Sequence, residues 1–115
     1  MPVIIYHNPR CSKSRQALKL LQERGLDPKI VEYLKTPPSL EELRKLLKQL
    51  NVTASDLLRR KEPAYKKAKL DRQGVTDNEV IAAMVADPIL IERPIVVVGS
   101  KAIIGRPPED VLTLL

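Results

Sequence analysis

Residues 3–25 of the chain read VIIYHNPRCSKSRQALKLLQERG. The apolar run at residues 3–6 predicts a short buried strand, and the HNPR sequence that follows breaks it. Apolar residues then recur at helical spacing from about residue 12 to 24, where Gly25 is suited to close a helix. This stretch therefore predicts a strand, a tight connection and a helix that begins next to the single cysteine, Cys11.

The segments on the C-terminal side of this stretch complete a sheet. Residues 30–34 (IVEYL) predict a second strand, parallel to the first because a helix connects them. Residues 95–98 and 101–104 flank a Gly-Ser turn and predict a hairpin. A final short helix is expected after residues 107–108, which are both proline.

The middle of the chain is predicted to be helical. Three helix starts carry a hydroxyl residue followed three positions later by an acidic residue: Ser39–Glu42, Thr53–Asp56 and Thr76–Glu79. The helix that starts at Thr53 is expected to run on through a segment rich in basic residues, residues 59–72. The order of elements predicts an α/β fold of the thioredoxin-like type. It has a four-stranded mixed sheet flanked by helices, with a helical insert between strands 2 and 3.

Length and composition set the broad class. The chain has 115 residues, so we expect residues 1–115 to form a single domain. With 43% hydrophobic and 30% charged residues, it reads as a soluble globular protein. No apolar run approaches the roughly 18 residues of a membrane span, and the N-terminus lacks the basic region of a signal peptide. We therefore expect a cytoplasmic location and no membrane partner.

The basic residues are concentrated in one segment. The formal net charge is +6, and residues 59–72 hold seven basic residues against Glu62 and Asp71. Such a segment attracts anions, or is simply a solvated helix face. There is no Trp or Phe and there are only three Tyr to stack on bases, so nucleic acid is not an expected partner.

Cys11 is the candidate nucleophile. It lies where a strand ends and a helix begins, and free backbone N–H groups and the helix dipole there stabilise a thiolate. Arg10, Lys13 and Arg15 add positive charge nearby, and His7, the one histidine, could pair with the thiolate. The alternatives are a structural, buried cysteine and a histidine that only hydrogen-bonds a loop.

Ser14 stands where a second cysteine would complete a C-X-X-C motif. The chain therefore cannot resolve a Cys11 adduct by forming an internal disulfide, and an external thiol is needed. The Ser14 hydroxyl can hydrogen-bond a sulfur or an oxyanion, or it can cap the helix.

Three arginines are candidates for binding an anion. Arg93 precedes Pro94 at the entry to the third strand, Arg106 follows the fourth strand, and Arg59 lies in the basic segment. In a thioredoxin-like sheet, the loop before the third strand holds a cis proline beside the active cysteine, so a cis Arg93-Pro94 bond is expected. A planar guanidinium grips tetrahedral oxyanions with two parallel hydrogen bonds, although each arginine alone could also be a surface charge.

These segments together resemble the ArsC family of glutaredoxin-linked arsenate reductases, and in particular its short ArsC-like branch. The resemblance is carried by residues 7–15 (HNPRCSKSR), 33–38 (YLKTPP), 57–59 (LLR), 88–97 (PILIERPIVV) and 104–108 (IGRPP). It implies a thioredoxin-like fold, catalytic Cys11, and an oxyanion site made by Arg59, Arg93 and Arg106. We expect His7, Asn8, Ser14, Arg15 and Pro94 to be supporting residues of this site.

The same resemblance implies a reaction. In the family's scheme the cysteine attacks arsenate, glutathione displaces an arsenic-bound oxygen, and glutaredoxin reduces the adduct to release arsenite. We therefore expect a small oxyanion substrate, glutathione as co-substrate, glutaredoxin as partner, no bound cofactor or metal, and a monomer. The alternative is a non-enzymatic protein similar to the Spx-type regulators, which share the fold, docking through the basic segment. Many of these use a C-X-X-C switch, and Ser14 argues against that switch here.

Overall fold

The computed structural model describes residues 2–115, which form two compact units. The first, here called the sheet unit, comprises residues 2–36 and 93–115, and the second, the helical unit, comprises residues 37–92. Each unit is described by itself. The insert predicted between strands 2 and 3 is thus a compact helical body, and the single-domain organisation stays a prediction.

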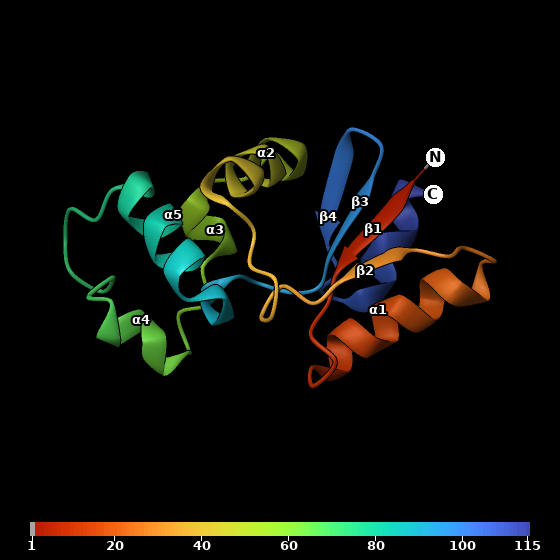
Figure 1. The fold of residues 1–115 in the computed structure, drawn as a ribbon, viewed down its shortest axis with the longest axis horizontal. Coiled ribbons are helices and arrows are strands. Elements are labelled where there is room, and N and C mark those ends of the chain that lie inside the picture. The colour runs from red at the N-terminus through yellow and green to blue at the C-terminus, as the bar shows by residue number, and fades with distance from the viewer. Residues whose placement is uncertain (1) are drawn as a thin grey trace. The chain divides into compact units, whose positions relative to one another are not determined.

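Within residues 2–115, the sheet unit contains a four-stranded mixed sheet (Figure 1). Its strands are β1 (Val3–Tyr6), β2 (Lys29–Val31), β3 (Ile95–Val98) and β4 (Lys101–Ile104), in the order β2-β1-β3-β4. β1 runs parallel to β2, while β3 is antiparallel to both of its neighbours. The thioredoxin-like fold class is confirmed by this arrangement and its flanking helices.

Two helical elements of the sheet unit pack against each other and help build its core. They are α1 (Ser12–Glu23) and the 3-10 helix η2 (Pro108–Leu114). Alternate residues of β1 are buried, as the period of two in a strand requires. The core cluster joins the sheet to both helices and consists of Val3, Ile5, Ala17, Leu21, Val96 and Val111.

The helical unit consists of short helices that pack against one another (Figure 1). Its elements are α2 (Leu40–Leu50), α3 (Ala54–Leu57), α4 (Pro63–Lys67), α5 (Asp77–Ala86) and the 3-10 helix η1 (Pro88–Leu90). The three predicted capping boxes are present at the starts of α2, α3 and α5. In each, the hydroxyl accepts a backbone N–H that no helical carbonyl can reach.

Two sequence-based boundaries were wrong. The strand predicted at residues 30–34 ends at Val31, because the Glu32 carbonyl accepts the N–H groups of Lys35 and Thr36 in a turn. The helix predicted to run from Thr53 through the basic segment ends at Leu57, and a separate α4 follows. The predicted final short helix is present, as a 3-10 helix. No helix within residues 2–115 is both long enough and apolar enough to cross a membrane.

Candidate active site

One end of the sheet gathers the segments that carry the candidate residues. Tyr6, the last residue of β1, pairs with Val31 at the end of β2 and with Ile95 at the start of β3. Ile95 in turn pairs with Ile104, the last residue of β4. The register therefore brings together the loop after β1, the residues before β3 and the residues after β4.

Cys11 is the N-cap residue of α1, in extended conformation, and is partly buried. Its backbone N–H donates to the Asn8 carbonyl at 3.0 Å, which closes a tight turn after β1. The first turn of α1 contains no acidic residue. The thiol therefore lies at the positive end of a twelve-residue helix without a neighbouring carboxylate on that helix.

Two guanidinium groups reach this thiol. Nη2 of Arg106 lies 3.6 Å from Sγ of Cys11, and the Arg93 side chain also hydrogen-bonds the sulfur. Nε of Arg106 donates to the backbone carbonyl of Arg93 at 2.7 Å, which links the two arginines. The Arg93-Pro94 bond is cis, as predicted, and the Arg106-Pro107 bond, which was not predicted, is cis as well. Arg93 and Arg106 thus converge on Cys11.

The pKa of Cys11 is lowered from the ordinary value of a thiol. Partial burial has the largest single effect and would raise this pKa, but the hydrogen bonds and charge at the site outweigh it. The donors are the backbone N–H of Ser14, the side chain of Arg93 and the backbone N–H of Lys13, and the Arg93 charge adds to them. The thiolate is the form that these groups stabilise.

His7, Asn8 and Ser14 form a buried polar cluster behind the cysteine loop. The Ser14 hydroxyl oxygen accepts the Asn8 backbone N–H at 3.0 Å and lies 2.6 Å from Nδ1 of His7. Burial, the largest effect, lowers the pKa of His7; Glu32 opposes this shift and Arg15 adds to it. A neutral imidazole can accept a hydrogen bond from the Ser14 hydroxyl at Nδ1. The position of His7 fits the alternative in which it hydrogen-bonds the loop, rather than a direct pair with the thiolate.

The remaining supporting residues hold the loop in place. The side chain of Asn8 accepts the Arg10 backbone N–H at 3.0 Å, and Nη1 of Arg15 donates to the Pro9 carbonyl at 2.9 Å. Pro94 is buried and its carbonyl accepts the Gly105 N–H at 2.8 Å. These contacts fix the backbone on both sides of the thiol.

Arg59, the third predicted anion ligand, belongs to the helical unit. Its Nη1 lies 2.6 Å from Oε1 of Glu92 and its Nε lies 3.2 Å from Oε1 of Glu62, and 18% of its side chain is exposed. Sequence reasoning missed both carboxylates. The three-residue spacing of Arg59 and Glu62 could have indicated the first pair, because side chains three apart are neighbours on a helix, whereas Glu92 is distant in sequence. The part of Arg59 in an oxyanion site stays a prediction.

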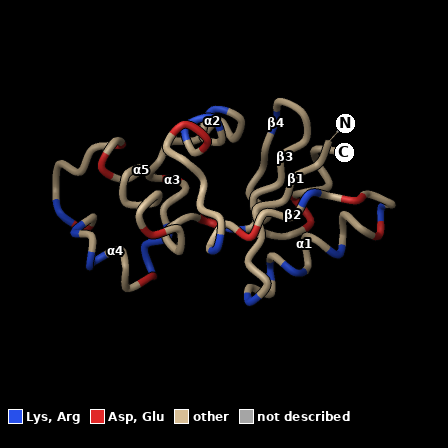
Figure 2. Tube along the Cα trace, in the orientation of Figure 1, with Lys and Arg blue, Asp and Glu red and all other residues tan. Residues whose placement is uncertain are grey.

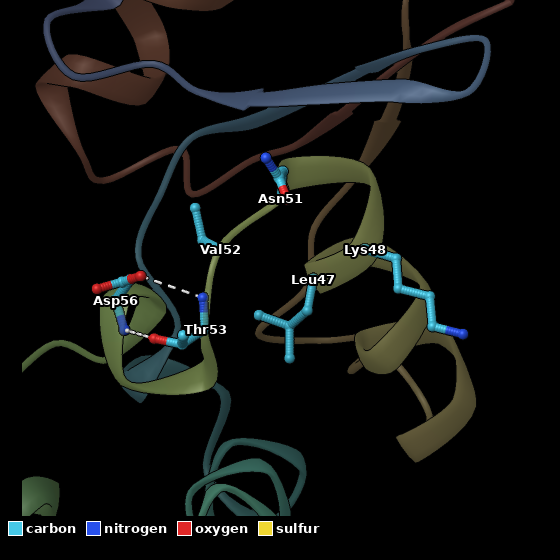
Figure 3. A pocket seen from close by; sticks show the side chains of 6 residues that line it. All are labelled: Leu47, Lys48, Asn51, Val52, Thr53 and Asp56. Atoms are coloured by element: carbon cyan, nitrogen blue, oxygen red, sulfur yellow. Dashed lines mark hydrogen bonds between the residues drawn. The ribbon is translucent and has the colours of Figure 1, made fainter.

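The helical unit also has an open pocket of about 390 Å³ (Figure 3). Its polar side chains include Thr53 and Asp56, which hydrogen-bond each other's backbone N–H groups in the capping box of α3. The backbone and hydroxyl hydrogen bonds of Thr53 lower the pKa of Asp56. These groups stabilise a helix start and are already engaged. Across residues 2–115, no cluster of three or more His, Cys, Asp or Glu side chains could hold a metal ion.

Comparison with known proteins gives matches over nearly the whole chain. A family model described as the ArsC family matches residues 6–114. The arsenate reductase of Neisseria meningitidis serogroup A is 44% identical over 117 residues, with all of both chains covered. That of Escherichia coli is 40% identical over 113 residues, covering 98% of this chain and 80% of its own length. A solved structure of an arsenate reductase from Vibrio cholerae gives a TM-score of 0.96 at 48% identity and covers 100% of this chain and 98% of the other.

Proposed function

The chain belongs to the ArsC family, and we propose that it is an oxidoreductase that reduces arsenate, or a similar oxyanion, through Cys11. The observation that carries this proposal is the convergence of two guanidinium groups and two backbone N–H groups on one thiol. A thiolate at a helix N-terminus is a nucleophile at neutral pH. The guanidinium groups and the helix end bind a tetrahedral anion beside it.

In the first step the Cys11 thiolate attacks arsenic, a sulfur–arsenic bond forms, and one oxygen leaves as water after taking up protons. Arg93 and Arg106 bind the oxygens that remain and offset their negative charge. Asn8, Ser14 and Arg15 act through the loop that they hold, and His7 acts through Ser14. In this scheme they are positioning residues.

The adduct requires thiols from outside the chain, because Cys11 is the one cysteine. Glutathione displaces a second oxygen as water, giving arsenic bound to both sulfurs. The thiolate of glutaredoxin then attacks the glutathione sulfur, forms a disulfide with it, and leaves two electrons on arsenic. Water releases arsenite and frees Cys11. Overall, arsenate and two external thiols give arsenite, one disulfide and one water.

A turnover assay with purified chain, arsenate, glutathione and glutaredoxin tests this scheme, with arsenite as the measured product. Cys11→Ser is expected to abolish turnover, because the hydroxyl is a far weaker nucleophile. Arg93→Lys is expected to lose most activity although it keeps the charge, since the planar fork is lost. Lys101→Arg, at the opposite end of the sheet, serves as the matched control and is expected to keep wild-type turnover.

Two results would contradict the scheme in different ways. Full activity in Cys11→Ser would show that the proposed nucleophile is wrong. No turnover by the wild-type chain, with Cys11 still reactive toward iodoacetamide near neutral pH, would keep the thiol chemistry and exclude arsenate as the substrate. Omitting glutathione or glutaredoxin in turn tests the proposed reductants, and sedimentation of the active species tests the proposed monomer.

A second candidate function is a binding protein that docks on an acidic surface. It is favoured by the basic segment of the helical unit, where the side chains of Arg60, Lys61, Lys66, Lys67, Lys69 and Arg72 are exposed. This function needs neither a reactive thiol nor bound anion. A stable complex that Cys11→Ser retains and that a Lys66→Glu/Lys67→Glu variant loses would support it over the enzyme.

A further inference from the structure

We propose that the pocket beside the Cys11 loop is the docking site for an acidic thiol-reductant protein, which inserts an apolar side chain there. The proposal rests on the proposed function to the extent that a second protein must reach the sulfur on Cys11. It adds where that protein binds and the kind of side chain, an apolar one, that makes the contact. It concerns residues that take no part in binding the oxyanion.

The pocket has a volume of about 230 Å³ and a largely apolar wall. It is lined by the loop before Cys11 and by the turn after β2: His7, Asn8, Pro9, Arg10, Glu32, Leu34 and Lys35. Leu34, one of these lining residues, is a large apolar side chain that is 38% exposed. The pocket therefore offers an apolar surface that adjoins Arg10, the residue directly before the nucleophile in the sequence.

The shape of this pocket suits a side chain better than a whole small thiol. Pockets that enclose drug-sized ligands measure roughly 300–1,000 Å³ and bring several polar groups to the ligand. This one is smaller, and its wall is mostly apolar. An apolar anchor surrounded by polar contacts is the arrangement found at protein interfaces.

Two of the residues that line the pocket are basic, Arg10 and Lys35, and one is acidic, Glu32. In the sequence, Arg10, just before α1, and Lys13, Arg15 and Lys19 in α1 precede its first acidic residue, Glu23. Figure 2 shows basic segments along α1. Lys35 lies on the rim with 78% of its side chain exposed, and the one acidic residue lining the pocket, Glu32, is 3.7 Å from it. In the proposed scheme Arg93 and Arg106 bind the oxyanion, so Arg10 and Lys35, which line the pocket, are cations that the oxyanion does not require. They complement an acidic surface.

The test uses the Cys11–glutathione mixed disulfide of the purified chain and a glutaredoxin chosen for acidic residues around its thiol. The glutaredoxin thiolate attacks the glutathione sulfur, its new disulfide forms, and Cys11 leaves as thiolate. Mass spectrometry gives the rate at which Cys11 is released. Arsenate is absent, so this result is independent of whether arsenate is the substrate.

Leu34→Ser is expected to slow release by glutaredoxin about fivefold or more, because the apolar anchor loses its contact. Lys35→Glu is expected to slow it about tenfold at low salt, and the difference from wild type should shrink as salt rises. Lys101→Glu, an equal charge reversal at the far end of the sheet, is the matched control and should match wild type. Release by dithiothreitol should be the same in every variant.

Three outcomes would overturn the proposal. Equal glutaredoxin rates in all variants would show that the pocket is not a docking site. If dithiothreitol also releases Cys11 more slowly from the variants, and by the same factor, the substitutions act on the reactivity of the disulfide and not on docking. If release by free glutathione slows as much as release by glutaredoxin, the pocket serves the small thiol and no protein anchor is needed.

Discussion

At the scale of single residues, the reactivity of Cys11 depends on donors that outweigh burial. Two of them are backbone N–H groups, from Lys13 and Ser14, and every sequence that starts a helix here would supply them. The side-chain donors are specific to this chain, since Arg93 contributes both a hydrogen bond and a charge. Arg93 is therefore the residue whose replacement should change the thiol most directly.

Arg93→Gln is expected to raise the pKa of Cys11 toward the free-thiol value of about 8.5. The thiolate is the form that is alkylated, so the midpoint of the alkylation rate against pH should lie below that value in wild type and higher in the variant. Iodoacetamide alkylation followed across pH measures both midpoints. Lys101→Gln is the control, and a wild-type midpoint at or above the free value would mean that Cys11 is an inert structural residue.

At the scale of elements, the site depends on how closely β4 passes Pro94. Gly105 follows β4, is buried, and donates its N–H to the Pro94 carbonyl. A Cβ at this position would lie 2.9 Å from Cγ of Pro94 and 2.9 Å from Cγ1 of Val111. Neither atom is at the end of a flexible side chain, so the backbone here approaches the proline because residue 105 has no side chain.

Gly105→Ala is therefore expected to destabilise the chain by about 1–3 kcal/mol, the usual cost of overpacking a core. Urea denaturation measures the free energy of unfolding, with Ser100→Ala in the exposed turn as control. A variant as stable as wild type would show that Pro94 and Val111 can move aside without cost.

At the scale of the whole molecule, the structure consists of two compact units, one of which is built from two stretches that are far apart in sequence. The sheet unit is made of both ends of the chain, and the helical unit has its own apolar core, which includes Leu43, Leu57 and Met84. Two chain connections join the units, after residue 36 and before residue 93. The single-domain prediction depends on whether the sheet unit and the helical unit unfold together.

We expect one cooperative transition, as is usual for a chain of this length. Hydrogen exchange measured across a urea titration should give the same midpoint for peptides from β1 and β3 as for peptides from α2 and α5. Two separate midpoints would instead show that the helical unit is a domain of its own, and the single-domain prediction would then be wrong.

The sequence by itself determined the features that local interactions encode. The three capping boxes could be predicted because both partners lie three residues apart, as in Ser39 and Glu42. The hairpin of β3 and β4 and the position of Cys11 at the start of α1 also follow from neighbouring residues. In each case the deciding contact spans a few residues, so that no distant segment is needed to form it.

The tertiary structure decided the features that depend on contacts between segments distant in sequence. Leu58 leaves the predicted helix to form a β-bridge with Ile91, so the helix that began after Thr53 stops early. Arg93 and Arg106 reach Cys11 because the register of β1, β3 and β4 aligns their ends. The carboxylate partner of Arg59 at position 92 is likewise distant in sequence. Such contacts depend on strand register and packing, and local sequence patterns do not fix them.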